Sequence, residues 1–227
     1  MPDDVIVIVS AYDEADRLPA TIAALREAFP GARLVVADDA STDATAAVAL
    51  AAGAEVVTAP RNLGKGGATT RAAERVLHRA WEPDPPVFVL CDGDLAASAR
   101  HLPALADAVR SGGADLAVAA FERRVGGGFG LAKGFARWAI RRRCGFEAAA
   151  PISGQRALSG RALRVAVPFA PRFGMEIGMT VDVARAGLRV REVALPLEHR
   201  ATGRTWRGFV HRGRQLKDFL AVYASRR

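Results

Sequence analysis

Cysteine and aromatic residues are scarce in this sequence. Two of its 227 residues are cysteines and 7% are aromatic. Cys91 and Cys144 are far apart and lack the close spacing of zinc ligands, which argues against a disulfide framework and a structural zinc site. A reducing compartment is therefore expected, and we predict a cytoplasmic protein.

Long apolar runs are also missing. A membrane-spanning helix needs about 18 or more consecutive apolar residues, and no such run occurs. The first residues are acidic and lead into a short apolar run at 5–9, which is typical of a first strand and not of a secretion signal. No Gly-x-Gly-x-x-Gly follows that run, which argues against a nicotinamide dehydrogenase.

Positive charge, by contrast, is abundant. The formal net charge is +8, which indicates anionic partners such as nucleotides or phospholipid headgroups. Arginine and alanine are both frequent throughout, so the charge alone identifies no site. No aromatic stacking platform accompanies it, and we expect no nucleic-acid partner.

The first 120 residues alternate between short β-branched runs and longer alanine- and leucine-rich stretches. This pattern predicts a mostly parallel α/β sheet flanked by helices on both faces, in which ligands bind beyond the carboxyl ends of the strands. We predict strands at 5–9, 33–37, 54–58, 87–91 and 116–119, and helices at 18–29, 42–52, 67–80 and 101–111.

The pattern changes after residue 120. Residues 122–134 are rich in glycine and include Arg123 and Arg124, which suits a loop that closes over a ligand. Further helices are expected near 133–143 and 173–186, and a strand at 190–195. Residues 204–227 predict a basic amphipathic helix that either packs on the core or lies on an anionic membrane surface. No linker interrupts the chain, so we predict a single domain.

Asp92-Gly93-Asp94 is the sharpest local motif. Carboxylates two residues apart in extended backbone project to the same side and can share one hard cation. The glycine between them lets a ligand approach the backbone closely. A solvated turn is the alternative, but the buried strand before the motif and the acids at other strand ends favour a metal site.

Acidic residues also follow the second predicted strand, at Asp38 and Asp39. Ser41 or Thr42 can cap the next helix, but a cap does not account for two successive acids. A carboxylate here can accept hydrogen bonds from a ribose hydroxyl or a base N–H, and we expect both roles.

Three further residues have two interpretations each. Lys65 stands between glycines, without the spacing of a P-loop, and either meets an anion at a helix start or belongs to a plain turn. Glu176 lies early in a predicted helix, where a carboxylate suits the helix dipole but can also act as a general base. His199 is a lone histidine, which is more often structural or solvated than a metal ligand.

Taken in order, these segments resemble the family 2 glycosyltransferases of the GT-A fold, which is Rossmann-like. The resemblance is strongest to the dolichyl-phosphate mannose synthase-like polyprenyl-phosphate sugar transferases and their soluble bacterial relatives, and it covers nearly the whole chain. The segments that carry it are Val-Ser-Ala-Tyr-Asp-Glu at 9–14, Asp-Asp-Ala-Ser-Thr-Asp at 38–43, Arg-Asn-Leu-Gly-Lys-Gly-Gly-Ala at 61–68, Asp-Gly-Asp at 92–94, Ser-Gly-Gln at 153–155, Arg-Phe-Gly-Met-Glu at 172–176 and Glu-Val-Ala-Leu-Pro-Leu at 192–197.

The resemblance implies transfer of one sugar, with inversion, from a UDP- or GDP-linked donor, with Mg²⁺ or Mn²⁺ as cofactor. It implies a nucleotide-sugar half at 1–120 and an acceptor half at 121–227. The acceptor would be a polyprenyl phosphate or another membrane-associated molecule, which would place the protein at the inner face of the membrane.

The resemblance also implies a role for each motif residue. The donor pocket would comprise Ser10, Tyr12, Asp13, Glu14, Asp38, Asp39, Lys65, Asp92 and Gly93. The metal ligands would be Asp92, Asp94 and His199. The catalytic residues would be Lys65, Asp94 and Glu176. The acceptor site or lid would comprise Arg123, Arg124, Ser153, Gly154 and Gln155.

Some features depart from the family pattern. Ser10 and Asp13 stand where the first motif usually has proline and asparagine, which leaves the base preference open. The Gln-x-x-Arg-Trp motif of processive synthases is absent, which favours one sugar per acceptor.

A catalytically idle partner of a membrane enzyme remains an alternative. A sugar-1-phosphate nucleotidyltransferase would need a glycine- and arginine-rich loop that residues 10–17 lack. The oligomeric state is left open.

Overall fold

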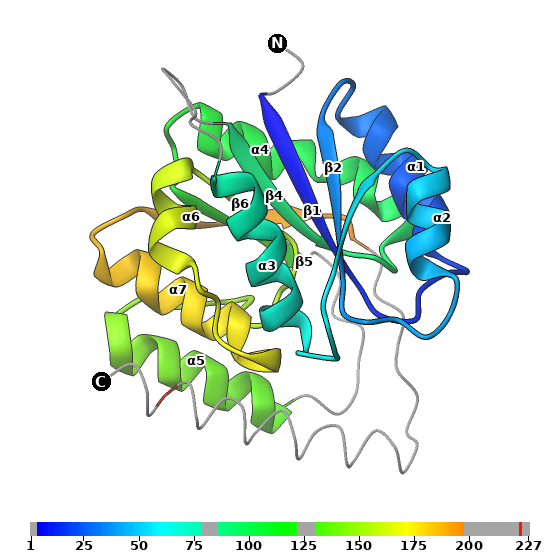
Figure 1. Ribbon diagram of the computed structural model, residues 1–227. Coiled ribbons are helices and arrows are strands. Elements are labelled where there is room, and N and C mark those ends of the chain that lie inside the picture. Colours follow the sequence, from blue (N-terminus) through cyan, green and yellow to red (C-terminus); the bar gives the residue numbers. More distant parts are fainter. Residues whose placement is uncertain (1–3, 79–85, 122–129, 198–222, 224–227) are drawn as a thin grey trace.

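The computed structural model describes residues 4–78, 86–121, 130–197 and 223. Within them, seven strands form one sheet in the order β3-β2-β1-β4-β6-β5-β7 (Figure 1). The pairings are parallel except those of β6, which runs antiparallel to both β4 and β5. The predicted mostly parallel sheet is confirmed. The strands are β1 (Val5–Ala11), β2 (Arg33–Asp38), β3 (Glu55–Thr58), β4 (Val87–Asp92), β5 (Leu116–Phe121), β6 (Arg156–Leu158) and β7 (Val190–Leu195).

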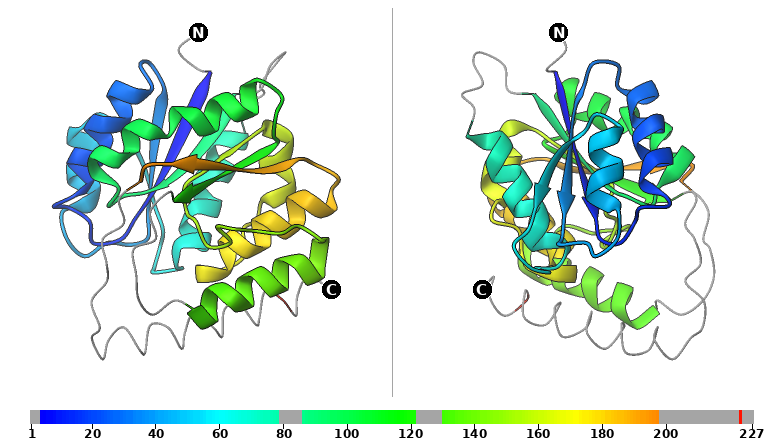
Figure 2. Two further views of the ribbon diagram at one scale, coloured as in Figure 1. Left: turned by 180° about the vertical axis from the view of Figure 1, so that it is seen from behind. Right: turned by 45° about the vertical axis from the view of Figure 1, so that its right-hand side comes forward.

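Helices cover both faces of the sheet, as Figure 2 shows. On one face lie α1 (Leu18–Ala28), α2 (Thr45–Ala51), the 3-10 helix η1 (Ala96–His101) and α4 (Pro103–Arg110). On the other lie α3 (Lys65–Leu77), α6 (Gly160–Ala166) and α7 (Met175–Arg185), which a short 3-10 turn, η2 (Arg172–Gly174), precedes. α5 (Gly130–Cys144) packs outside α7.

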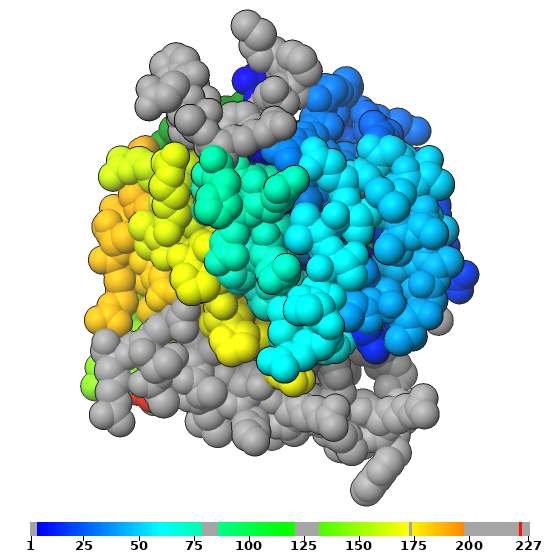
Figure 3. Space-filling view, viewed as in Figure 1, coloured from blue at the N-terminus to red at the C-terminus, as the bar shows by residue number. Residues whose placement is uncertain are grey.

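Strand β1 shows why these segments form a buried sheet. Val5, Val7 and Val9 point into the core beneath α1 and α4, while Ile6 and Ile8 point into the core beneath α3 and α7. Both faces are covered, so the strand is a continuous apolar run without polar alternation. In the space-filling view, α3 and α6 lie side by side on one face of the molecule (Figure 3).

The strand β6, the helix α6 and the 3-10 helix η1 were not predicted from the sequence. β6 has only three residues, which is too short to show a period, and α6 follows it directly. Ser159 caps α6, because its side chain accepts a hydrogen bond from the amide of Ala162. That capping residue was the one available sequence signal.

The predicted start of the helix at 42–52 was wrong. α2 begins at Thr45, and its N-cap Ala44 provides no side-chain hydrogen bond. Ser41 and Thr42 therefore do not cap the helix. Their hydroxyl groups bind Asp38 and Asp13 instead, which holds residues 41–44 in a turn.

The antiparallel direction of β6 brings residues 153–155 to the edge of the sheet where the parallel strands β1, β2 and β4 end. Arg156 pairs with Leu90 of β4, so Gly154 and Gln155, which precede it, lie level with the end of β4. The N-termini of α3 and α7 meet at the same edge (Figure 1). We call this the strand-end edge.

Several predicted features lie outside the described residues. These are the lid arginines Arg123 and Arg124, the candidate ligand His199, and the basic helix at 204–227 apart from Tyr223. The Tyr223 ring packs on Trp138 of α5 at 4.9 Å between centroids, and Arg143 lies 3.8 Å above it. Among the described helices, none has the length and apolarity to cross a membrane.

Candidate active site

Lys65, the first residue of α3, joins carboxylates from two other elements. Its Nζ lies 2.6 Å from Oδ1 of Asp92, at the end of β4, and 2.8 Å from Oε1 of Glu176, in the first turn of α7. Burial disfavours the charged ammonium, but the two carboxylates outweigh it and raise the pKa of Lys65 above its usual value. Lys65 is therefore a permanent cation between the two acids.

Asp92 is held by three side chains. Oδ1 also accepts a hydrogen bond from the Ser10 hydroxyl at 3.2 Å, and Oδ2 accepts one from the Gln155 amide at 2.9 Å. Burial acts to raise the pKa of Asp92, but Lys65, Gln155 and Ser10 stabilise the ionised form and lower it. Both carboxylate oxygens thus have partners within the protein.

Asp94, two residues further on, is exposed. Gly93 places it there: the Gly93 amide donates to the Ser10 carbonyl at 2.9 Å, and the Thr21 hydroxyl donates to the Gly93 carbonyl at 2.7 Å. Burial raises the pKa of Glu14, and the negative charge of Asp94 raises it further. The Asp94 carboxylate is therefore close enough to Glu14 to act on it electrostatically, while Arg17 pairs with Glu14 at 3.1 Å and acts in the opposite direction.

The donor set suits a hard cation that takes further ligands from a substrate. Within the described part of the chain, no three His, Cys, Asp or Glu side chains gather into a metal cluster. Mg²⁺ is commonly bound by one or two carboxylates plus substrate phosphates, without a cage made only of protein ligands. The exposed carboxylate of Asp94 meets that requirement.

Asp38 and Asp39 tie loops together at the strand-end edge. Asp39 is 4% exposed, and its carboxylate accepts the backbone amides of Leu63 at 2.6 Å and Gly64 at 2.8 Å. Burial raises the pKa of Asp39 more than these two bonds lower it. Asp38 accepts the amide and the hydroxyl of Ser41. Contact of Asp39 with a base or ribose stays a prediction.

The segment after β1 is tied to the segment after β2. Asp13 adopts a left-handed φ of 52°, and its Oδ1 accepts the amide of Thr42 at 2.7 Å. The amide of Glu14 donates to Thr45 Oγ1 at 2.8 Å. Tyr12 stands beside this tie with 46% of its surface exposed, so its ring is free to pack against a ligand.

No role was predicted for Arg156, Thr180 or Glu192 from the sequence. Arg156 is 1% exposed and donates through Nε to the Ser153 carbonyl and through Nη1 to Thr180 Oγ1. Glu192 of β7 accepts the amides of residues 149 and 150. Arg156 and Glu192 bind the segment at 149–155 directly, and Thr180 does so through Arg156, which lies in the strand β6 that was not predicted. The available signal was an arginine directly after the Ser-Gly-Gln motif.

Gly154 leaves no room for a side chain. A Cβ atom added there would collide with Lys65 Nζ and would lie 2.6 Å from Oδ2 of Asp92. We expect Gly154→Ala to displace the ion pair and to lower kcat/KM by about 10²-fold, because misplacing a catalytic group by ~1 Å has an effect of that order. Gly134→Ala, in α5 where an added Cβ meets no atom within 4 Å, is the control. Equal activity of the two variants would contradict the prediction.

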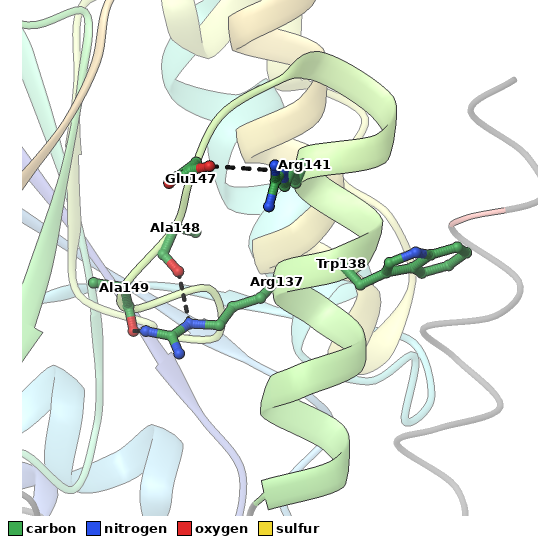
Figure 4. A pocket seen from close by; sticks show the side chains of 6 residues that line it. All are labelled: Arg137, Trp138, Arg141, Glu147, Ala148 and Ala149. Carbon is green, nitrogen blue, oxygen red and sulfur yellow. Dashed lines mark hydrogen bonds and ion pairs between the residues drawn. The ribbon is translucent and has the colours of Figure 1, made fainter.

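A surface hollow of about 460 Å³ lies between α5 and residues 147–149, as Figure 4 shows. Its arginines are turned to the protein itself: Arg137 Nε donates to the Ala148 carbonyl at 2.9 Å, and Arg141 lies 3.6 Å from Glu147. None of the predicted site residues lines it. The hollow is separate from the strand-end site.

Comparison with known proteins agrees with this geometry. The family model described as "Glycosyl transferase family 2" matches residues 6–153. The chain belongs to this family. It is 31% identical over 215 residues to the undecaprenyl-phosphate mannosyltransferase of Micrococcus luteus, covering 88% of this chain and 85% of that protein. It is 33% identical over 220 residues to the glucosyl-3-phosphoglycerate synthase of Mycolicibacterium paratuberculosis, covering 82% of this chain and 64% of that protein.

Solved structures of the Mycobacterium tuberculosis glucosyl-3-phosphoglycerate synthase share the fold. The complex with phosphoglyceric acid has a TM-score of 0.78 at 27% identity and covers 99% of this chain and 80% of that chain. The complex with Mg²⁺ and UDP has a TM-score of 0.77 at 26% identity and covers 99% and 79%. The predicted GT-A fold, family and enzyme class are confirmed: this family 2 protein is a nucleotide-sugar glycosyltransferase.

Proposed function

We propose that this glycosyltransferase moves one sugar, with the help of a divalent cation, from a nucleotide-diphosphate donor to an acceptor that carries a phosphate group. The observation that carries the proposal is the position of Lys65. It lies between Asp92 and Glu176 at the strand-end edge, and the exposed Asp94 follows two residues after Asp92. Asp92, on the proposed donor side, and Glu176, on the proposed acceptor side, thereby share the ammonium group of Lys65.

The donor side is built from the ends of β1, β2 and β4. The exposed Tyr12 ring would pack on the base, and Asp39, which also accepts the amides of Leu63 and Gly64, would contact the base or ribose. Lys65 and the amides at the start of α3 favour the donor diphosphate, because a helix N-terminus attracts anions. The neighbour structure that contains Mg²⁺ and UDP supports a nucleotide at this edge.

Asp94 would hold the cation directly, with Asp92 beside it and His199 as a further ligand. A divalent cation there would offset negative charge on the departing nucleoside diphosphate. Asp92, already bound to Lys65, Ser10 and Gln155, keeps the end of β4 in place while Asp94 faces outward.

The reaction would be a single displacement with inversion. The acceptor oxygen attacks the anomeric carbon opposite the departing diphosphate, whose charge Lys65 helps to stabilise. Glu176 takes the proton when the attacking group is a hydroxyl, whereas a phosphate oxygen is already ionised and needs no base. Arg123 and Arg124, in the glycine-rich segment, would close over the donor and exclude water.

The names of the relatives support an acceptor with a phosphate group. One relative acts on undecaprenyl phosphate and the other forms glucosyl-3-phosphoglycerate. These two acceptors differ in size and solubility but share a phosphate, and the net charge of +8 suits an anionic acceptor. A lipid acceptor would also fit the basic sequence at 204–227 on a membrane surface.

The proposal is tested by ligand-dependent thermal unfolding. UDP, GDP and their sugar conjugates are added with and without Mn²⁺. At 100 times Kd, the matching nucleotide with metal should stabilise the protein by about 2.7 kcal/mol, or roughly 5–10 °C. The donor so identified is then incubated with undecaprenyl phosphate or 3-phosphoglycerate, and product formation distinguishes the acceptors. Binding without transfer to any phosphate acceptor would favour a catalytically idle partner, and no shift with any nucleotide would overturn the proposal.

A further inference from the structure

Arg156 is a buried cation without a bound acid. It is 1% exposed, and no carboxylate of the described residues forms an ion pair with its guanidinium. Within the same residues its Nη2 has no hydrogen-bond partner. Burial lowers the pKa of Arg156 to about 10, although the charges of Glu176 and Glu192 act in the opposite direction. Because a buried, incompletely bonded charge destabilises a fold, its presence in β6 calls for an explanation.

The register of β6 places Arg156 directly below the active site. Arg156 pairs with Leu90 of β4 and Val118 of β5, whose side chains lie in the core beneath α3, α6 and α7. The Arg156 side chain therefore extends toward α7. Arg156 begins β6 and directly follows Gln155, which binds Asp92.

The guanidinium bonds in two directions. Nε donates to the carbonyl of Ser153 at 2.8 Å, and Nη1 donates to Thr180 Oγ1 at 2.9 Å. The Thr180 hydroxyl in turn donates to the Glu176 carbonyl, one turn earlier in α7, at 2.9 Å. This chain of bonds ends at the residue that meets Lys65.

The charges around Glu176 also link it to Arg156. Lys65 is one ammonium shared by two carboxylates, Asp92 and Glu176. The second positive charge near Glu176 is that of Arg156, which acts on it electrostatically from below. When Lys65 also binds a donor diphosphate, the positive charge of Arg156 would continue to act on Glu176.

We propose that Arg156 is a positioning residue of the transfer reaction: it holds the first turn of α7, and with it Glu176, in register with the Ser153-Gly154-Gln155 segment. This inference rests on the proposed function. Arg156 acts through Thr180 and Ser153 and touches no substrate. Its loss should disturb turnover while leaving the nucleotide pocket at β1 and β2 in place.

The test compares four substitutions in the full chain. Arg156→Met removes the charge and both hydrogen bonds, Arg156→Lys keeps the charge, and Thr180→Val keeps the arginine but breaks the link to Glu176. Arg164→Met, at an exposed position of α6, is the matched control. We expect Arg156→Met to lower kcat about 30-fold while the KM for the donor changes less than about 3-fold, because the interaction acts on the acceptor side.

Thr180→Val should lower kcat in the same direction, and Arg156→Lys should restore part of it. An unchanged kcat in Arg156→Met, or a parallel loss of nucleotide binding, would overturn the inference. If Arg156→Met does not fold, the same kcat criterion applies to Thr180→Val and Arg156→Lys.

Amide hydrogen exchange separates this inference from the proposed function. Exchange in residues 153–155 and 176–180 should be faster in Arg156→Met than in the wild type, while exchange in β1 and β2 stays unchanged. If the wild type transfers no sugar, the proposed function fails. Faster local exchange would then still support positioning by Arg156, and unchanged exchange would overturn it.

Discussion

Asp94→Asn is expected to lower metal-dependent kcat/KM on the order of 10³-fold, because it removes the carboxylate that we propose to hold the cation, two residues beyond the end of β4. Asparagine keeps the size and polarity of the side chain, and the exposed position does not stabilise the core. The additional thermal stabilisation that Mn²⁺ confers on the nucleotide complex should disappear with the activity. Stabilisation by nucleotide alone should remain.

Asp107→Asn provides the matched control for Asp94→Asn. Asp107 is an exposed aspartate of α4 that pairs with Arg110 at 3.3 Å, away from the strand-end edge. The Asp107→Asn substitution should leave unchanged both the transfer activity and the stabilisation by Mn²⁺. Undiminished metal-dependent transfer by Asp94→Asn would show that the cation binds elsewhere, and the proposed roles of Asp92 and His199 would need to be revised with it.

Lys65→Met is expected to destabilise the protein as well as inactivate it. Removing the ammonium leaves Asp92 and Glu176 without the cation that they share, and breaking such a largely buried ion pair costs about 3 kcal/mol. Transfer should fall on the order of 10³-fold, because the Lys65 ammonium that we propose to stabilise the negative charge of the leaving diphosphate is gone. Urea unfolding and steady-state kinetics measure the two effects.

The destabilisation by Lys65→Met should depend on pH. In the wild type the pKa of Asp92 is lowered and that of Lys65 is raised, so the pair is fully charged at neutral pH. The contribution of the Asp92 carboxylate to the free energy of unfolding is complete above its pKa in the unfolded chain, about 4. It is lost as the pH falls through the lower pKa that Asp92 has in the folded protein. The stability difference between wild type and variant should therefore shrink below about pH 4.

A double variant tests the electrostatic origin of this effect. Glu176→Gln in the Lys65→Met background removes one of the stranded charges, so the double variant should be more stable than Lys65→Met alone. Equal stabilities would show that Lys65 contributes through packing and not through its charge.

The alternation of apolar runs and alanine-rich stretches was sufficient to predict the parallel part of the sheet. β1, β2 and β4 are continuous buried runs, and their length and β-branched composition distinguish them from helices. β6 could not be predicted in the same way. Its three residues include a buried arginine, and it is a strand only because β4 and β5 hold it on both sides.

The site residues were identifiable one motif at a time, but their partners were not. Asp92, Lys65 and Glu176 stood in three separate motifs with separate interpretations. Gln155 was assigned to the acceptor side, whereas its amide binds Asp92. Asp39 was expected to contact a base or ribose, which stays a prediction, and both of its oxygens accept amides of the loop before α3. In each case the motif singled out a residue without indicating which protein groups it touches.

The sequence by itself determined the α/β class, the family resemblance and the strand-end acids, because periodicity and short motifs are local properties of the chain. Only the tertiary structure decided that Lys65 joins Asp92 to Glu176 and that Arg156 is buried near them. It also decided that the Asp92 carboxylate is bound by other side chains, whereas Asp94 is exposed. The physical reason is distance. Ion pairs and burial depend on separations of a few ångströms between residues far apart in the chain, and these are set by the order of the strands and the antiparallel direction of β6.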